Sequence, residues 1–379
     1  MRLEQRNWTD ADGWMFQAGE RLGGSAHLVL IFGATRALRD QRLLEDAKGR
    51  YPGAHIFGCS TAGEICGTRV FDDSLVATAI RFDDSYVQGA RVTLAESGDS
   101  LGAGEALAQS LDPDGLVHVL VLSDGLGVNG THLVRGLTTH LPPTVTVTGG
   151  LAGDGERFKN TLVIWEDSVK EDMIVALGFY GNRIRVGYGS LGGWDPFGPE
   201  RLVTRSKGNA LYELDGRSAL DLYKLYLGEH ARGLPATGLL FPLSLRTKTG
   251  EAGVVRTILS VDEKEQSMTF AGDVPEGAYV RLMKANFDRL IDGAVGAAEY
   301  SCQALGTASP NLAILISCIG RKLVLKQRVE EEVEGVRDIL GAQAVLTGFY
   351  SYGEIAPFAT GAKCELHNQT MTITTFSEG

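Results

Sequence analysis

The chain repeats one short stretch, Gly58-Cys59-Ser60-Thr61-Ala62-Gly63-Glu64-Ile65, which aligns without a gap on Gly348-Phe349-Tyr350-Ser351-Tyr352-Gly353-Glu354-Ile355. A shorter third copy reads Gly149-Gly150-Leu151-Ala152-Gly153-Asp154. Each copy follows an apolar run of strand length, at 55–57, 344–347 and 144–148. Because glycine and a carboxylate recur at matching places, the sequence predicts an internal repeat that decides the fold.

The segments before and after each copy also match. Upstream lie the apolar runs 27–32, 116–122 and 312–318, which reach Gly33, Gly125 and Gly320. These glycines precede the three motif copies by 25, 24 and 28 residues, which is room for one helix and a return turn. In the third unit apolar residues from Val329 to Leu340 recur at helical spacing between charged ones. Further strand-like runs follow at 74–82, 173–179 and 371–376. We therefore expect an α/β protein of repeated strand-helix-strand units.

The segment 182–301 differs in character and is expected to be an α/β insert. It opens with the glycine-dense stretch 187–199, which is interpreted either as a mobile flap over a ligand or as a linker between domains. Helices are predicted at about 219–227 and 285–304, and strands at 201–214, 254–261 and 267–270. We place a boundary near residue 217, between two associated halves.

Composition and charge restrict the classes of partner. The 379 residues carry a net charge of −11 without a basic block, which argues against duplex nucleic acid and anionic membranes as partners. No apolar run approaches the roughly 20 residues of a spanning helix, and the polar N-terminus does not resemble a secretory signal. The five cysteines are odd in number and form no CxxC pair, which favours reduced thiols in the cytoplasm.

Four stretches together resemble the FIST family: the first and second motif copies, Leu211-Tyr212-Glu213-Leu214-Asp215-Gly216, and the closing Tyr352-Gly353-Glu354-Ile355 with His367-Asn368-Gln369-Thr370. The resemblance runs from about residue 26 to residue 373. It implies an N-terminal extension at 1–25, a FIST N-terminal domain at 26–217 and a FIST C-terminal domain at 218–379.

The resemblance also implies a function. Proteins of this family are intracellular sensors that bind a small ligand, for which amino acids have been proposed. They pass its occupancy to a signalling partner such as a histidine kinase, a diguanylate cyclase or a phosphodiesterase. Some stand-alone members are described as haem proteins that sense nitric oxide and act on a histidine kinase. No kinase, receiver or cyclase sequence is present here, so we expect the output to pass through a separate protein, with a homo-oligomer as a further option.

The repeated motif is the candidate ligand site, because ligands of open crossover sheets bind beyond the carboxyl ends of the strands. Glycines let the backbone approach a ligand closely, and a carboxylate near amide donors suits an amino acid or another zwitterion. In the other interpretation the glycines only form turns and the acids only cap the next segment. The candidate contacts are Cys59, Ser60, Thr61, Gly63 and Glu64 in the first copy, Gly150, Gly153 and Asp154 in the second, and Tyr352, Gly353 and Glu354 in the third.

Two residues carry alternative functions. His367 is the first choice as axial ligand if haem b is bound, since imidazole is a common haem ligand; the other interpretation is a histidine that hydrogen-bonds its loop into place. Cys59 follows a strand like a nucleophile on a sharp turn, so a thiol or acyl-transfer enzyme is the remaining alternative to a buried small residue. We expect binding and not catalysis.

Overall fold

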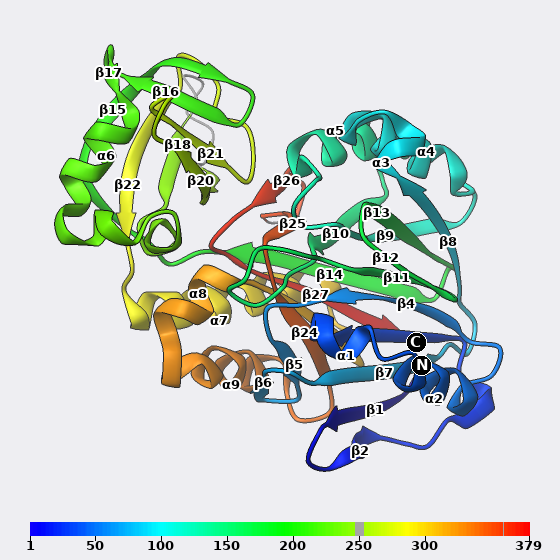
Figure 1. Cartoon of the computed structure of the whole chain (residues 1–379). Coiled ribbons are helices and arrows are strands. Elements are labelled where there is room, and N and C mark those ends of the chain that lie inside the picture. The colour runs from blue at the N-terminus through cyan, green and yellow to red at the C-terminus, as the bar shows by residue number, and fades with distance from the viewer. Residues whose placement is uncertain (247–253, 359) are drawn as a thin grey trace.

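The computed structural model describes residues 1–246, 254–358 and 360–379. Three related units and their helices form the main body, and a small domain projects from it (Figure 1). None of the helices in these ranges is both long enough and apolar enough to cross a bilayer.

The three predicted units are confirmed. In each, two parallel strands flank one or two helices, and a third strand runs antiparallel beside the first. The first unit comprises β3 (Leu28–Gly33), α1 (Thr35–Leu38), α2 (Gln41–Arg50), β4 (His55–Ser60) and β7 (Leu75–Arg81). The second comprises β9 (Leu116–Ser123), α5 (Gly130–His140), β10 (Thr146–Leu151) and β13 (Met173–Tyr180). The third comprises β23 (Leu312–Cys318), α8 (Ile319–Leu325), η4 (Lys326–Arg328), α9 (Val329–Leu340), β24 (Val345–Ser351) and β27 (Met371–Glu378).

The segment after each motif is a hairpin that leaves its own unit, a feature that the sequence did not predict. The hairpin β5 (Glu64–Cys66) and β6 (Arg69–Phe71) pairs with β24 of the third unit. The hairpin β11 (Val163–Trp165) and β12 (Ser168–Lys170) pairs with β4 of the first unit. The hairpin β25 (Gly353–Pro357) and β26 (Cys364–His367) pairs with β10 of the second. Each sheet therefore contains strands of two units.

Outer strands and helices complete the three sheets. Residues 1–25, predicted to be an extension, include β1 (Arg2–Thr9), β2 (Gly13–Gly19) and η1 (Gly23–Ser25), and β1 pairs with β7. In the other sheets β8 (Tyr86–Thr93) pairs with β13, and β14 (Ile184–Leu191) pairs with β27. The remaining helices of the body are α3 (Leu94–Ser97), α4 (Ser100–Ser110) and α7 (Phe287–Leu305). The sheet orders are β12-β11-β4-β3-β7-β1-β2, β26-β25-β10-β9-β13-β8 and β14-β27-β23-β24-β5-β6.

One apolar core is shared by the three sheets. The Phe32 ring of the first unit lies 4.8 Å from that of Phe349 in the third, and Phe179 of the second lies 4.7 Å from Phe376 of the third. The helices bury the outer faces of the sheets: α1 and α2 cover the first, α4 and α5 the second, and α7 and α9 the third. Because the inner faces have one common core, the three units stabilise each other.

The glycine-dense stretch runs from strand β14 through a short connector into strand β15. Gly187 and Gly189 lie in β14, where an added Cβ would stand 2.1 Å from the Ser301 carbonyl oxygen and 2.3 Å from that of Ala297 on α7. The flap interpretation is therefore wrong for this part, because the glycines allow a helix to pack closely on the strand. Residues 192–194 connect β14 to the small domain, as the linker interpretation expects.

The small domain holds one antiparallel sheet around its own core. The sheet order is β19-β18-β22-β15-β16-β21-β20, with β17 paired to β16. The predicted boundary near residue 217 lies at β17, inside this sheet. The predicted helix at 219–227 is confirmed as α6, and the one at 285–304 corresponds to α7. The small domain consists of β15 (Asp195–Lys207), β16 (Ala210–Leu214), β17 (Arg217–Ser218), α6 (Ala219–Leu227), η2 (Gly228–Gly233), η3 (Ala236–Leu240), β18 (Leu243–Arg246), β19 (Val254–Arg256), β20 (Ile258–Asp262), β21 (Ser267–Phe270) and β22 (Tyr279–Lys284).

The first glycine of each motif copy is required by strand packing. A Cβ at Gly58, Gly149 or Gly348 would stand 1.9 Å from the carbonyl oxygen of the facing residue on the preceding strand. The facing residues are Ile31, Val121 and Leu315, at the same register position in the three units. We expect Gly348→Ala to lower the free energy of unfolding by about 1–3 kcal/mol, because the added methyl group pushes the two strands apart.

Urea unfolding of Gly348→Ala checks this, with Gly49→Ala as the matched control. Gly49 lies on the exposed side of α2 with nothing near its Cβ position, so alanine there is expected to stabilise the protein by about 0.5–1 kcal/mol. A Gly348→Ala protein as stable as the parent would contradict the close approach of the strands.

Candidate functional site

The three motif copies meet and hydrogen-bond one another through their backbones. The first and second copies are joined by Gly153 N–H, which donates to Ser60 O at 2.9 Å. The first and third are joined by Ala62 N–H to Tyr350 O at 2.8 Å. The second and third are joined by Tyr352 N–H to Leu151 O at 3.2 Å. The three motif copies therefore meet at one place, and much of their backbone hydrogen-bonding capacity is used among themselves.

An open cleft of about 580 Å³ lies beside the first copy. This volume is within the range of about 300–1,000 Å³ that small-molecule sites occupy. Thr61 to Glu64 form one side, and α8 of the third unit forms another. Residues 155–157, which follow the second copy, and the turn at 72–73 complete the lining. The cleft thus joins parts of all three units.

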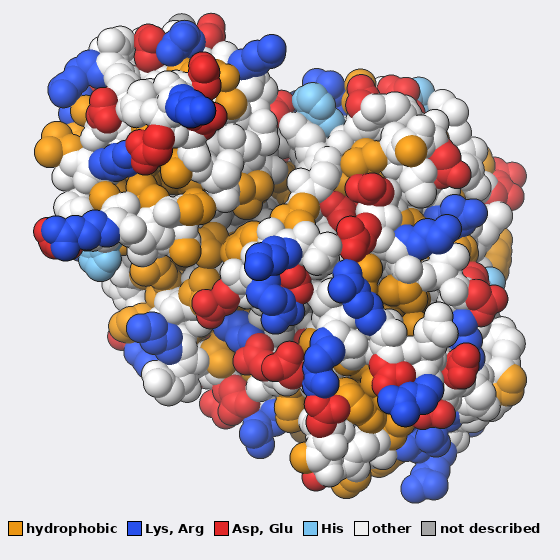
Figure 2. Space-filling model, viewed as in Figure 1, with side chains coloured by type: hydrophobic (Ala, Val, Ile, Leu, Met, Phe, Trp, Pro, Cys, Tyr) orange, Lys and Arg blue, Asp and Glu red, His pale blue; other side chains and the backbone are white. Residues whose placement is uncertain are grey.

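Charged groups of both signs line the cleft. Lys322 of α8, with 15% of its side chain exposed, donates from Nζ to Ala62 O at 2.8 Å and forms an ion pair with Asp72. Its Nζ also lies 5.6 Å from the centre of the Tyr350 ring. Lys326 and Arg157 add two more cations, and Lys and Arg side chains alternate with acidic ones across this face of the body (Figure 2). A site of this kind can hold a carboxylate and an ammonium group at once.

Glu64 is a buried carboxyl group at the wall of the cleft. Its Oε1 accepts a hydrogen bond from Thr61 Oγ1, and its Oε2 accepts from Ser74 Oγ at 2.7 Å and from Ser74 N–H at 3.2 Å. Burial raises the pKa of Glu64 to about 7, against the opposing effect of these hydrogen bonds and of the Lys322 charge. The carboxyl group therefore titrates near neutral pH.

This titration predicts a pH-dependent stability. The native state, with a Glu64 pKa of about 7, binds more protons than the unfolded chain, in which the ordinary value of 4.5 applies. The free energy of unfolding therefore falls as the pH rises from about 4.5 to about 7. We expect Glu64→Gln to remove this fall, so that the variant gains up to about 3 kcal/mol relative to the parent across this window and nothing more above it.

Urea unfolding at a series of pH values measures the difference. Glu45→Gln, on the exposed side of α2, serves as the control for the loss of one negative charge. Parallel pH profiles for the parent and Glu64→Gln would mean that Glu64 does not take up a proton on folding.

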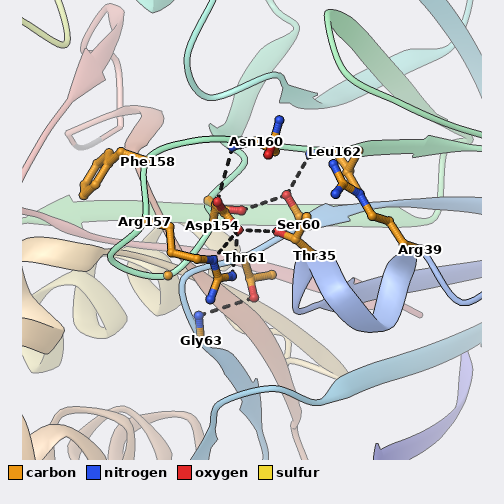
Figure 3. Close-up of polar contacts among 12 residues, drawn as sticks. Thr35, Arg39, Ser60, Thr61, Gly63, Asp154, Arg157, Phe158, Asn160 and Leu162 are labelled. Carbon is orange, nitrogen blue, oxygen red and sulfur yellow. Dashed lines mark hydrogen bonds and ion pairs between the residues drawn. The ribbon is translucent and has the colours of Figure 1, made fainter.

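The carboxylate of the second copy, Asp154, accepts hydrogen bonds from neighbouring residues (Figure 3). Asp154 Oδ1 accepts hydrogen bonds from Thr35 Oγ1 and Arg157 Nη2, both at 2.7 Å, and Oδ2 accepts from Asn160 N–H at 3.2 Å. Burial would raise the pKa of Asp154, but the bonds from Arg157, Thr35 and Asn160 hold it below its ordinary value. Asp154 is therefore a charged residue that fixes the loop and α1.

The carboxylate of the third copy, Glu354, also accepts hydrogen bonds from neighbouring residues. Glu354 accepts from Ser351 Oγ at 2.6 Å and from Thr370 Oγ1 at 3.0 Å, and burial raises its pKa to about 8. The small domain lies against the adjoining segment, since Gln369 Nε2 donates to Leu239 O of η3 at 2.9 Å. Gly353 is packed between Leu151 and Leu366. Tyr352 lies at the second copy, where its OH accepts from Asp154 N–H at 3.0 Å and stays out of the cleft lining.

Two predicted contact residues point away from the cleft. Cys59 is 0% exposed in the central core, where burial raises the pKa of its thiol well above the ordinary value. Gly150 faces Ile316 and Phe349 in the interior. The structure corrects both assignments, because alternation along a strand turns these positions toward the core. Ser60 is also buried and donates to Gly153 O at 2.7 Å, so it joins two motif copies.

His367 is fully buried in β26. Its Nε2 is 2.7 Å from Ala356 O, and its ring centre is 4.1 Å from that of Phe358. Burial lowers its pKa to about 4, and Nδ1 has no hydrogen-bond partner among the residues that the structure describes. A haem ligand needs a ring nitrogen that faces room for a porphyrin. The surroundings of His367 do not fit this, whereas the hydrogen bond to Ala356 agrees with the interpretation that it fixes its loop.

Sequence reasoning missed the cations and one acid pair of the cleft. Lys322 lies just after Gly320, at the carboxyl end of a unit's first strand, which is the only sequence signal for its place. Asp72 and Asp73 are exposed acids of a turn, as their place in the sequence predicts, and Asp72 also forms an ion pair with Lys322. Their proximity follows from the hairpin β5–β6 crossing to the third unit.

Two family models match consecutive parts of the chain. The model of the FIST N domain matches residues 27–217, and that of the FIST C domain matches residues 219–357. The chain therefore belongs to the FIST family, whose domains are sensory domains of signalling proteins.

The similar proteins that the comparisons found share little sequence with this chain. The uncharacterized protein MJ1623 of Methanocaldococcus jannaschii is 24% identical over 362 residues, which covers 88% of this chain. The chain spans only 66% of the length of that relative. Among solved structures, a chorismatase is 11% identical with a TM-score of 0.34, covering 99% of this chain and 98% of its own. A cyanuric acid hydrolase from A. caulinodans is 10% identical with a TM-score of 0.19, covering 78% of this chain and 99% of its own. Neither structural similarity carries a functional argument.

Proposed function

We propose that this protein is a cytoplasmic sensor that binds an amino acid or a similar zwitterion in the cleft beside the first motif copy. The observation that carries the proposal is the pairing of Lys322 with Asp72 inside a cleft that also contains Glu64 and Arg157. A ligand carboxylate would bind the cations, and a ligand ammonium group would bind Asp72 and its neighbours. An incoming zwitterion can thus replace an existing ion pair without leaving a charge unpaired.

In this proposal only the first copy binds ligand. The carboxylates of all three copies accept hydrogen bonds from fixed neighbours, but it is the first copy whose residues line the open cleft. The motif residues Thr61 to Glu64 line the cleft, together with Lys322, Asp72 and Arg157. The second and third copies serve as scaffold.

The signal would pass to a separate protein, such as a histidine kinase or an enzyme of cyclic-di-GMP metabolism. We propose binding without catalysis, since the thiol of Cys59 is in the core and away from the cleft. The described cysteines are all unpaired, which suits a reducing compartment. Haem-based sensing of nitric oxide gains no support from the buried, hydrogen-bonded His367.

Thermal-shift titration with each of the protein amino acids tests the proposal. A ligand present at about 100 times its Kd adds about 2.7 kcal/mol to the stability, which raises the unfolding temperature measurably. We expect Lys322→Ala and Asp72→Ala each to abolish the shift. Lys48→Ala is the matched control, because Lys48 lines a similar groove between α2 and the hairpin β11–β12.

Two results would contradict the proposal. One is that no amino acid raises the unfolding temperature of the parent. The other is that the shift persists in both Lys322→Ala and Asp72→Ala, which would place the binding site elsewhere.

A further inference from the structure

Helix α8 lies between the cleft and the two connections that attach the small domain. Lys322, on one side of this helix, contacts Ala62 and Asp72 in the cleft. The next residue back along the chain, Arg321, is fully buried on the other side. Helix α8, which has seven residues, thus contacts both the cleft and a connection to the small domain.

Arg321 holds the outgoing connection to the small domain. Its Nη1 donates to Gly192 O at 2.7 Å, and its Nη2 donates to Leu290 O of α7 at 2.6 Å. Gly192 lies three residues before β15, the first strand of the small domain. The guanidinium is fixed from behind by Glu332 of α9, whose Oε2 accepts from Nη2 at 2.7 Å. A shift of α8 therefore acts directly on the backbone of this connection.

The returning connection packs on the same helix. Trp194, from the outgoing connection, and Met283, from the end of β22, form one cluster with Leu290 of α7 and with Val324 and Leu325 of α8. We call these five residues the hinge cluster. Leu240 of η3 in the small domain packs against it, and Figure 2 shows hydrophobic side chains gathered where the small domain meets the body. Both connections therefore rest on the side of α8 that faces away from the cleft.

Two strained residues flank this helix. Lys326, which ends α8 and lines the cleft, has φ +51°, and Gln369, which lies against Gly320 of α8, has φ +65°. Both values are unfavourable for residues with a side chain. The buried Oε1 of Gln369 also has no hydrogen-bond partner among the described residues. Strained backbone of this kind persists only where the surrounding structure holds it, and both residues adjoin α8.

We propose that α8 transmits occupancy of the cleft to the small domain, whose position is the signal that a partner reads. The inference rests on the proposed function, because the ligand acts through Lys322. When a ligand carboxylate draws Lys322 away from Asp72, α8 shifts, and Arg321 and the hinge cluster carry the movement to residues 192–194. The small domain then turns as a unit, because it has its own core.

Trp194 is a built-in reporter of this movement. Its side chain is 6% exposed, and its Nε1 donates to Gln369 O at 3.0 Å. The other tryptophans, Trp8, Trp14 and Trp165, lie in the first sheet and are changed to Phe to leave one fluorophore. Hydrogen exchange of residues 192–194 in the parent chain gives the same readout if the triple variant does not fold.

The experiment adds an equimolar mixture of the protein amino acids other than Trp, Tyr and Phe, which would absorb or emit with the reporter, and measures both the unfolding temperature and the Trp194 emission. We expect the mixture to change both in the parent. Arg321→Lys keeps the charge beside Glu332 but loses the fork that reaches Gly192 and Leu290, so it should retain the thermal shift and lose most of the emission change. Arg42→Lys makes the same exchange at an exposed arginine of α2, so it should retain both the thermal shift and the emission change and serves as the matched control.

The other outcomes separate a failure of the coupling from a failure of the proposed function. A thermal shift without any Trp194 response in the parent overturns the coupling and leaves the proposed function intact. The absence of a thermal shift overturns the proposed function, and the coupling is then judged on Lys322→Gln without ligand. If that variant changes the Trp194 emission and Arg321→Lys suppresses the change, the coupling holds. If it leaves the emission unchanged, the coupling is wrong.

Discussion

Each of the three sheets depends on a hairpin contributed by a different unit, and this exchange organises the molecule. The hairpin after the first motif pairs with β24, the one after the second with β4, and the one after the third with β10. Without its borrowed hairpin each sheet would expose an unpaired strand edge beside the core, and buried backbone groups need partners. The chain must therefore run through the centre three times, and the motifs are the points at which it crosses. The glycines and carboxylates of the motifs stabilise these crossing points. In the first copy, some of these residues also line the open cleft.

A buried ion pair fixes the side of the molecule on which the cleft and the small domain meet. Arg321 and Glu332 are both 0% exposed, and Glu332 also accepts hydrogen bonds from Tyr350 OH at 2.7 Å and from Ser317 Oγ at 3.2 Å. Burial of two charges costs solvation energy, which only good geometry and full hydrogen bonding can offset. Here the guanidinium has the Glu332 carboxylate and two backbone carbonyls as acceptors. The pair sets the position of α8 relative to α7 and α9, and with it the position of Lys322 in the cleft.

The units of the fold were predictable because each has a strong local pattern. The apolar run that ends at Cys318 and the helical spacing from Val329 to Leu340 correspond to β23 and α9. The exchanged hairpins were not predictable, since β5 has three residues and its partner β24 lies far along the chain. The cleft follows from that pairing, so Lys322 and Asp72 could not be brought together in advance. Glu332 was hidden for another reason, because it stands among glutamates that look solvated.

The exchange of hairpins also sets the order in which the chain can fold during synthesis. The partner of β5 is β24, so the first hairpin remains without its neighbour until residues 345–351 have been synthesised. At about 5–20 residues per second this delay is on the order of tens of seconds. During that time the nascent chain carries apolar strands with open edges, and such edges favour pairing with other chains. The first sheet has all its strands once residue 170 is made, whereas the other two sheets wait for strands that follow residue 344, so the three units reach completion at different times.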